Sequence, residues 1–170
     1  MFPRLLGNTF ACLPPLVRAL HLHTGTRCYR GEVEVERGHG LLAALCIRVA
    51  HLPPAGQGPI EVEITADAHG ERWARHVAGH TMRSRLWAQG GLLCERLGLV
   101  TFGFRLHVQA GHIVWRVVRV RVLGLPLPAR WFAQVAAREY EEGGRYGFDV
   151  SAALPLAGLL VRYRGWLDVG

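Results

Sequence analysis

The chain contains no lysine, so all 20 of its basic residues are arginines. Lysine is the residue that forms Schiff bases, contacts phosphate groups in P-loops and acts as the base in serine–lysine hydrolases. Its absence therefore excludes these three kinds of site. Codon bias in a GC-rich genome is the simplest explanation for the arginines and requires no function.

Cysteine motifs, long apolar runs and a secretion signal are also lacking. No C-x-x-C pair occurs, so neither a zinc knuckle nor a redox pair is indicated. The longest apolar run, residues 152–161, is too short to span a bilayer, and residues 1–15 make a poor signal peptide. We therefore expect reduced thiols, a cytoplasmic protein and no membrane partner. The cysteines are Cys12, Cys28, Cys46 and Cys94.

The size and composition are those of one globular domain. The chain has 170 residues, half of them hydrophobic, so residues 1–170 can form a single domain with a core that needs no disulfides. The formal net charge is +7. Outward glutamates dilute the outward arginines on the predicted strands, which favours a solvated sheet surface over a nucleic-acid-binding face.

Two helices are predicted in the first third of the chain. Pro14 and Pro15 can begin a helix that ends within residues 21–25. Residues 41–51 place leucines and a valine at helical spacing before a Pro-Pro stop. Between these helices, residues 29–36 alternate between apolar and polar side chains, which predicts a strand.

From residue 60 onward the strand alternation recurs between short turns, and no helix is indicated. The alternation slips between Val117 and Val118, which predicts a β-bulge. Gly143 and Gly144 predict a two-residue hairpin turn. The fold class expected is α+β and mainly β: a strongly curved antiparallel sheet or barrel of about nine to ten strands, plugged or covered by two short N-terminal helices. The predicted strands are 60–65, 73–77, 82–86, 93–97, 102–108, 112–122, 131–142, 145–150 and 159–164.

Three polar residues, Arg75, Ser84 and Glu95, share the strand faces that should be buried. Trp73 lies on the same face as Arg75, and Tyr163 points inward by the same alternation. Because burying an unpaired ion costs several kcal/mol, we expect Arg75 to pair with Glu95, with Ser84 on the strand between them. Two interpretations stay open: these five residues are ligand-binding candidates in an apolar cavity, or the charges form a structural ion pair.

Metal and cofactor sites are not indicated. His21 and His23 form the only close histidine pair, and no third ligand lies near them. The chain has no nucleophile elbow, no H-E-x-x-H and no Gly-rich dinucleotide fingerprint. We therefore expect no bound metal and no cofactor.

Carboxylates flank the predicted Gly-Gly hairpin. Asp149 could pair with Glu139 or Glu141 as two acids, but Arg138 and Arg145 are neighbours of these residues. Ion pairs between strands on the outer surface are therefore the interpretation that we favour.

Several segments, in this order, resemble a bacterial family classified as a domain of unknown function. Domains of that family often follow an NAD(P)-binding domain of the short-chain or saccharopine-dehydrogenase-like type. The segments are LHLHTGTRCYRGEVEVERG at 20–38, WAR at 73–75 followed by Ser84, CERLG at 94–98, GLPLP at 124–128, EYEEGGRYGFDV at 139–150 and LPLAGLLVRYRGWL at 154–167. The positions typical of the family are Trp73, Arg75, Ser84, Glu95, Gly98, Phe148, Asp149, Tyr163 and Gly165.

The resemblance implies no activity and no catalytic residues, but it implies a role beside an oxidoreductase. Because the chain lacks a Rossmann half, we expect that it does not itself bind NAD(P). The first hypothesis is a module that binds a small, partly apolar and possibly acidic molecule anchored by Arg75. The alternatives are an interaction domain that docks an NAD(P)-dependent oxidoreductase, and an enzyme that uses Glu95 as a general acid or base beside Arg75. Whether there is catalysis is left open.

Overall fold

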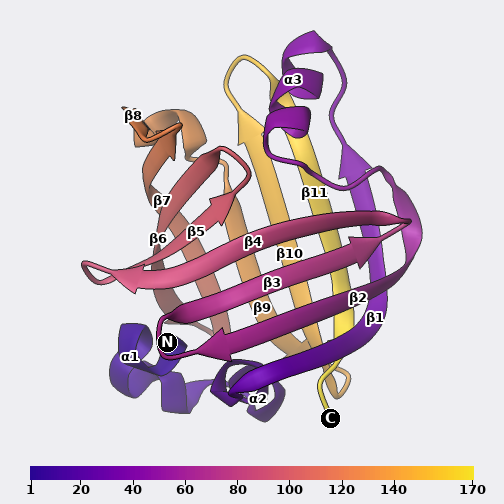
Figure 1. Ribbon diagram of the computed structural model, residues 1–170. Coiled ribbons are helices and arrows are strands. Elements are labelled where there is room, and N and C mark those ends of the chain that lie inside the picture. The colour runs from indigo at the N-terminus through magenta and orange to yellow at the C-terminus, as the bar shows by residue number, and fades with distance from the viewer.

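The computed structural model describes residues 1–170 and shows a closed antiparallel β-barrel (Figure 1). Ten strands form the wall, and the short strand β8 is added to β7. This confirms the predicted fold class. The strands are β1 (Gly25–Arg37), β2 (Gly56–Asp67), β3 (Gly70–Val77), β4 (His80–Gln89), β5 (Leu92–Leu97), β6 (Val100–Gln109), β7 (His112–Val122), β8 (Leu125–Leu127), β9 (Ala136–Glu142), β10 (Arg145–Leu154) and β11 (Gly158–Asp168).

The barrel closes because its two meanders join at both edges. Strands β1 to β7 pair in chain order, and so do β9 to β11. β11 then pairs with β1 over Arg30↔Asp168 to Arg37↔Val161, and β9 pairs with β7 over residues 136–139 and 113–116. Closure leaves no long strand edge exposed for pairing with another chain.

Helices lie at both ends of the barrel. The segments α1 (Phe2–Leu6), η1 (Gly7–Cys12) and α2 (Pro15–Leu22) fill one end, and α3 (Leu41–Val49) and η2 (Ala129–Phe132) lie at the other (Figure 1). The helices predicted to begin at Pro15 and at residue 41 are confirmed. α1 and η1 were not predicted, although Phe2, Leu6 and Phe10 are buried at the four-residue spacing that signals a helical apolar face.

The predicted bulge and the predicted Gly-Gly hairpin are both present. Gly103 pairs with Arg119 and Phe104 pairs with Val117, so Val118 is the extra residue in β7. Gly143 and Gly144 have φ values of 57° and 71° in the turn between β9 and β10. Two positive φ values are typical of the type I′ turn, whose twist matches that of antiparallel strands.

The strand predicted over residues 131–142 is wrong in its first part, because β9 begins only at Ala136. Residues 129–132 instead form the 3-10 helix η2 after Pro128. Phe132 and Val135 are buried at the end of the barrel. Tertiary burial therefore decides the course of this segment, and no regular alternation was available to reveal it.

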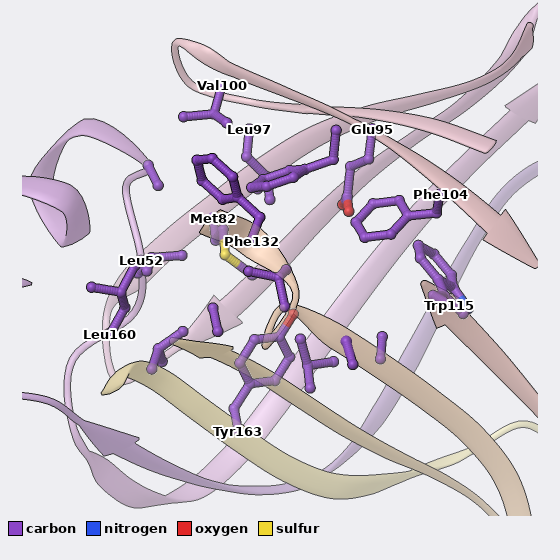
Figure 2. Close-up of a pocket in the computed structure, with 18 of the residues that line it drawn as sticks. Leu52, Met82, Glu95, Leu97, Val100, Phe104, Trp115, Phe132, Leu160 and Tyr163 are labelled. Atoms are coloured by element: carbon purple, nitrogen blue, oxygen red, sulfur yellow. The ribbon is translucent and has the colours of Figure 1, made fainter. Parts of the chain in front are cut away.

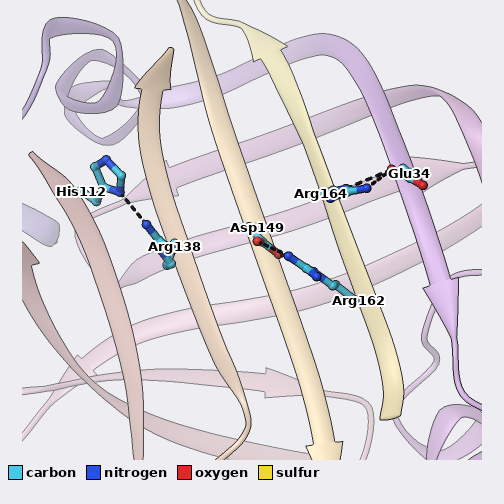
Figure 3. A network of polar contacts seen from close by, with 6 residues as sticks. All are labelled: Glu34, His112, Arg138, Asp149, Arg162 and Arg164. Atoms are coloured by element: carbon cyan, nitrogen blue, oxygen red, sulfur yellow. Dashed lines mark hydrogen bonds and ion pairs between the residues drawn. The ribbon is translucent and has the colours of Figure 1, made fainter.

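The outer face of the wall carries polar contacts between strands (Figure 3). Arg162 donates two hydrogen bonds to Asp149, at 2.8 and 3.2 Å, and Arg164 donates to Glu34 at 3.0 Å. Such exposed pairs contribute about 0–1 kcal/mol each. They leave the interior to apolar side chains and favour the observed register.

Candidate functional site

The barrel encloses a cavity of about 390 Å³. Its lining comprises 34 residues, and 30 of these are hydrophobic. A cavity of this volume is large enough for a small organic ligand, since binding pockets begin at about 300 Å³. Polar side chains are few, so their positions decide what chemistry the cavity can offer.

Arg75, Ser84 and Glu95 come together on the adjacent strands β3, β4 and β5; Arg75 and Glu95 line this cavity, whereas Ser84 does not. All three are buried. The Arg75 guanidinium donates from Nη1 to Ser84 Oγ at 3.0 Å and from Nη2 to Glu95 Oε1 at 3.4 Å. It also lies over the Trp73 ring, with 4.7 Å from Cζ to the ring centroid. The inward alternation expected from the sequence thus places these residues as predicted, while their role stays a prediction.

Arg75 is incompletely used by the protein. A guanidinium has five N–H donors, and the structure engages two of them. The contact to Glu95, at 3.4 Å, is longer than the roughly 2.7–2.9 Å that is usual for a charge-assisted hydrogen bond. Spare donors on a buried cation are a means of holding an oxygen-bearing ligand.

Tyr163 of β11 approaches from the opposite wall. Figure 2 shows its hydroxyl and the Glu95 carboxylate directed into the same space. No hydrogen bond joins Tyr163 to Arg75, Ser84 or Glu95. Burial raises the pKa of Tyr163 to about 12, and the Glu95 and Glu139 carboxylates raise it while the Arg75 charge lowers it. The hydroxyl is therefore a proton donor at neutral pH.

Trp73 and Trp115 also border the cavity, and they differ in their hydrogen bonding. Trp73 Nε1 donates to Glu71 Oε2 at 2.8 Å, whereas the buried Trp115 Nε1 has no partner. Glu71 is buried, and the sequence analysis missed it. Its burial could have been predicted, because Glu71 shares the inward strand face with residues 73, 75 and 77.

A second buried polar contact lies at the end filled by α2. His21 Nε2 and Glu139 Oε2 are 2.5 Å apart, and each residue is only 4% exposed. The Phe2 ring stacks on His21 with 3.6 Å between ring centroids. The prediction that Glu139 forms a surface ion pair is therefore wrong. The reason is that its partner comes from 118 residues earlier in the chain, which no local pattern reveals.

Tyr146 of β10 belongs to the same end of the cavity lining as Glu139. Burial raises the pKa of Tyr146 well above its usual value, and the Glu139 carboxylate raises it further. Tyr146 and Tyr163 therefore both keep their protons across the physiological range. The cavity lining therefore presents neutral hydroxyls beside the buried side chains of Arg75, Glu95 and Glu139, and its other arginine, Arg138, is exposed.

The histidines do not converge on a metal site. His21 is held by Glu139, while His23 Nδ1 contacts the Leu20 carbonyl at 2.7 Å. No three His, Cys, Asp or Glu side chains come together within reach of one ion. None of the helices is long and apolar enough to cross a bilayer.

Comparison with known proteins gives one positive finding. No curated protein matches the chain. A family described as Domain of unknown function (DUF4166) matches residues 13–167, a range that holds every barrel strand apart from the last residue of β11, and the polar residues of the cavity. The match confirms the resemblance to a domain of unknown function that the motifs indicated. The chain therefore belongs to the DUF4166 family.

Proposed function

We propose that this domain binds a small, mainly apolar molecule whose single polar group accepts hydrogen bonds from Arg75 and Tyr163. The observation that carries the proposal is a cavity of about 390 Å³ with 30 hydrophobic lining residues and one buried, incompletely paired arginine. A fully packed barrel would have left no such space, because protein interiors are normally close-packed.

The apolar lining favours a ligand that is itself mostly hydrocarbon. Burial of apolar ligand surface contributes about 25 cal/mol per Å² before the costs of association. A strongly polar ligand would lose its hydration and find few partners on these walls. The ligand class is therefore an aliphatic or ring compound rather than a sugar or nucleotide.

The polar end of the ligand is expected beside Arg75. Its spare N–H groups and the neutral Tyr163 hydroxyl are donors, so the complementary group is an acceptor. A carboxylate makes the strongest such contact, because a charge-assisted hydrogen bond contributes about 1.5–3 kcal/mol. The Glu95 carboxylate balances the charge of Arg75. Because the hydrogen bond between them is long, at 3.4 Å, a ligand carboxylate can replace Glu95 as the acceptor.

The proposal can be tested by displacement of a fluorescent polyene fatty acid. Purified protein is titrated with this probe, which is then displaced by decanoic acid, its methyl ester or the matching alcohol. We expect the acid to bind most tightly. In the double variant Arg75→Met/Glu95→Gln, which leaves no unpaired charge, the affinity for the acid should fall by roughly 10- to 100-fold.

The methyl ester should lose much less affinity in that variant, because it makes no charged contact. Arg83→Met is the matched control, since Arg83 lies on β4 beside this group but is exposed on the outer face. The proposal is wrong if the probe does not bind to the folded protein. An equal loss for acid and ester would refute the assignment of Arg75 as the anchor.

A further inference from the structure

The end of the barrel at α3 carries most of the large apolar side chains that the protein exposes. We define the rim as the five connections at this end: residues 38–55, 78–79, 98–99, 123–135 and 155–157. Of the ten exposed large hydrophobic residues in the molecule, all but Leu22 and Val118 belong to it. The rim residues are Leu41, Leu42, Leu45, Leu99, Leu123, Leu125, Trp131 and Leu156.

These side chains come from four separate connections, so no single helix or turn explains them. Leu41 and Leu156 are 93% and 92% exposed. Both belong to the rim although more than one hundred positions separate them in the chain. Figure 1 shows α3 and β8 at one end of the barrel and α1 and α2 at the other. Scattered exposed leucines are ordinary, but a ring collected at one end marks an interaction surface.

The rim surrounds the way into the cavity. Leu45 of α3 and Trp131 of η2 both line the cavity and are 59% and 47% exposed. The lining of the cavity therefore includes exposed side chains of the rim, so we expect a ligand to enter and leave at this end.

The charge of the rim has one sign. Its five connections contain Arg48 and Arg130, both exposed, and no aspartate or glutamate. Exposed Arg96, Arg121 and Glu36 lie at the strand ends next to it, two basic residues and one acid. The connections at the opposite end also contain two arginines and no acid, but the strands β2, β9 and β11 end there on exposed Asp67, Glu142 and Asp168. An apolar surface with a basic border complements an anionic lipid surface.

We infer that the rim docks on the surface of an anionic lipid bilayer, so that the cavity opens toward the membrane interface. Leucines and a tryptophan suit this depth, where the side chain is partly in hydrocarbon and partly among headgroups. The arginines would contact lipid phosphates. The inference goes beyond the proposed function, because it concerns the surface on which the protein docks rather than what the cavity holds. It departs from the expectation, based on the lack of a long apolar run, that the protein has no membrane partner.

The test is flotation of the intact protein with vesicles of phosphatidylcholine alone or mixed with about equal phosphatidylglycerol. We expect binding to the anionic vesicles and little to the neutral ones. The variant Leu41→Glu/Leu156→Glu should reduce the bound fraction by about tenfold or more, since it removes two apolar insertions and adds charge repulsion. Arg48→Glu/Arg130→Glu should weaken binding to anionic vesicles in the same direction.

Leu22→Glu is the matched control, because Leu22 is an exposed leucine at the opposite end. It should leave vesicle binding unchanged. The inference is overturned if the wild type does not float with anionic vesicles, or if Leu22→Glu loses as much as the rim variant. It is equally overturned if the rim holds a second copy or a protein partner instead, which would appear as self-association or complex formation lost in the rim variant without any vesicle binding.

Fatty-acid displacement separates this inference from the proposed function. The rim variant should bind the polyene probe as the wild type does, while Arg75→Met/Glu95→Gln should still float with vesicles. Loss of probe binding in the wild type would refute only the ligand, and loss of flotation only the docking.

Discussion

One end of the barrel is filled by α1 and α2, whereas the other end, at α3 and η2, carries exposed apolar side chains, some of which also line the cavity. At the filled end Phe2, Val17 and Leu20 are fully buried, and His21 and Glu139 form a short buried hydrogen bond. At the rim, by contrast, eight large hydrophobic residues are exposed. The same wall therefore has one end covered by closely packed helices and one end where large apolar side chains stay exposed to solvent.

This difference shows where stability and function reside in the molecule. A buried hydrogen-bonded pair is costly to disturb, and the apolar helices that cover it exclude water. Exposed leucines add nothing to folding, so their retention at one end favours a role in contact with something else. Changes in the wall should therefore have the largest effect on stability, followed by changes at the filled end, in the cavity and at the rim.

The largest effect is expected in the wall that both ends share. A Cβ at Gly165 would lie 2.0 Å from the Glu32 carbonyl oxygen and 2.9 Å from the Phe148 ring. The backbone of β1 is held by its hydrogen bonds to both neighbouring strands and cannot move away without breaking them. Gly165→Ala should therefore lower the free energy of unfolding by about 3 kcal/mol. Urea denaturation measures this change. Gly58→Ala, where a Cβ meets nothing within 4 Å, should change it by less than about 0.5 kcal/mol.

The next effect concerns the filled end. Glu139→Ala leaves the buried His21 Nε2 without a partner and should cost about 2 kcal/mol. In this variant the amide hydrogens of α1 and α2 should exchange faster than in the wild type, and this increase should be larger than in the strands. Glu142→Ala, at an exposed position next to the hairpin, should do neither. Equal loss in both variants would mean that the buried pair does not hold this end.

A pH effect is expected in the cavity. Tyr163 has its pKa raised from 10.0 to about 12, so the folded state retains a proton that the unfolded state loses first. The contribution of the protonated Tyr163 hydroxyl to the free energy of unfolding is therefore fully present below pH 10, and it is lost as the pH rises toward 12. No lysine titrates in this range, which simplifies the measurement. Tyr163→Phe should show a shallower decline in urea denaturation, and a parallel decline would contradict the assignment.

The smallest effect is expected at the rim. Leu41→Ser/Leu156→Ser should change the free energy of unfolding by less than about 0.5 kcal/mol, because both side chains are more than nine-tenths exposed. Thermal and urea denaturation measure this change. A loss of several kcal/mol would show that the rim leucines pack within the fold, and it would weaken the contrast between the two ends.

Local alternation predicted much of the wall correctly. The bulge at Val118 and the inward positions of Arg75, Ser84 and Glu95 follow from the period-two pattern of strands. The hairpin at Gly143 and Gly144 follows from the positive φ values that glycine adopts in turns. The burial of Glu71 was available in the same pattern and was overlooked. These features depend on neighbouring residues alone, which is why they can be read from a sequence.

Contacts between distant segments could not be predicted in this way. The strand expected at residues 131–135 was replaced by η2, because Phe132 and Val135 are buried at the barrel end. Glu139 was predicted to lie on the surface, because its burial depends on a contact with His21 of α2, which is distant in the chain. The gathering of Leu41 and Leu156 on one rim likewise depends on the closure of the barrel.

The sequence by itself determined a mainly antiparallel β domain, with an arginine and a glutamate turned toward its interior. It could do so because the side-chain period of a strand and the φ preferences of glycine are local properties. Tertiary packing alone explains why the sheet closes, why a cavity of about 390 Å³ remains, and why apolar side chains are buried at one end and exposed at the other. Those outcomes depend on which distant surfaces exclude water together, and no short segment of the chain contains that information.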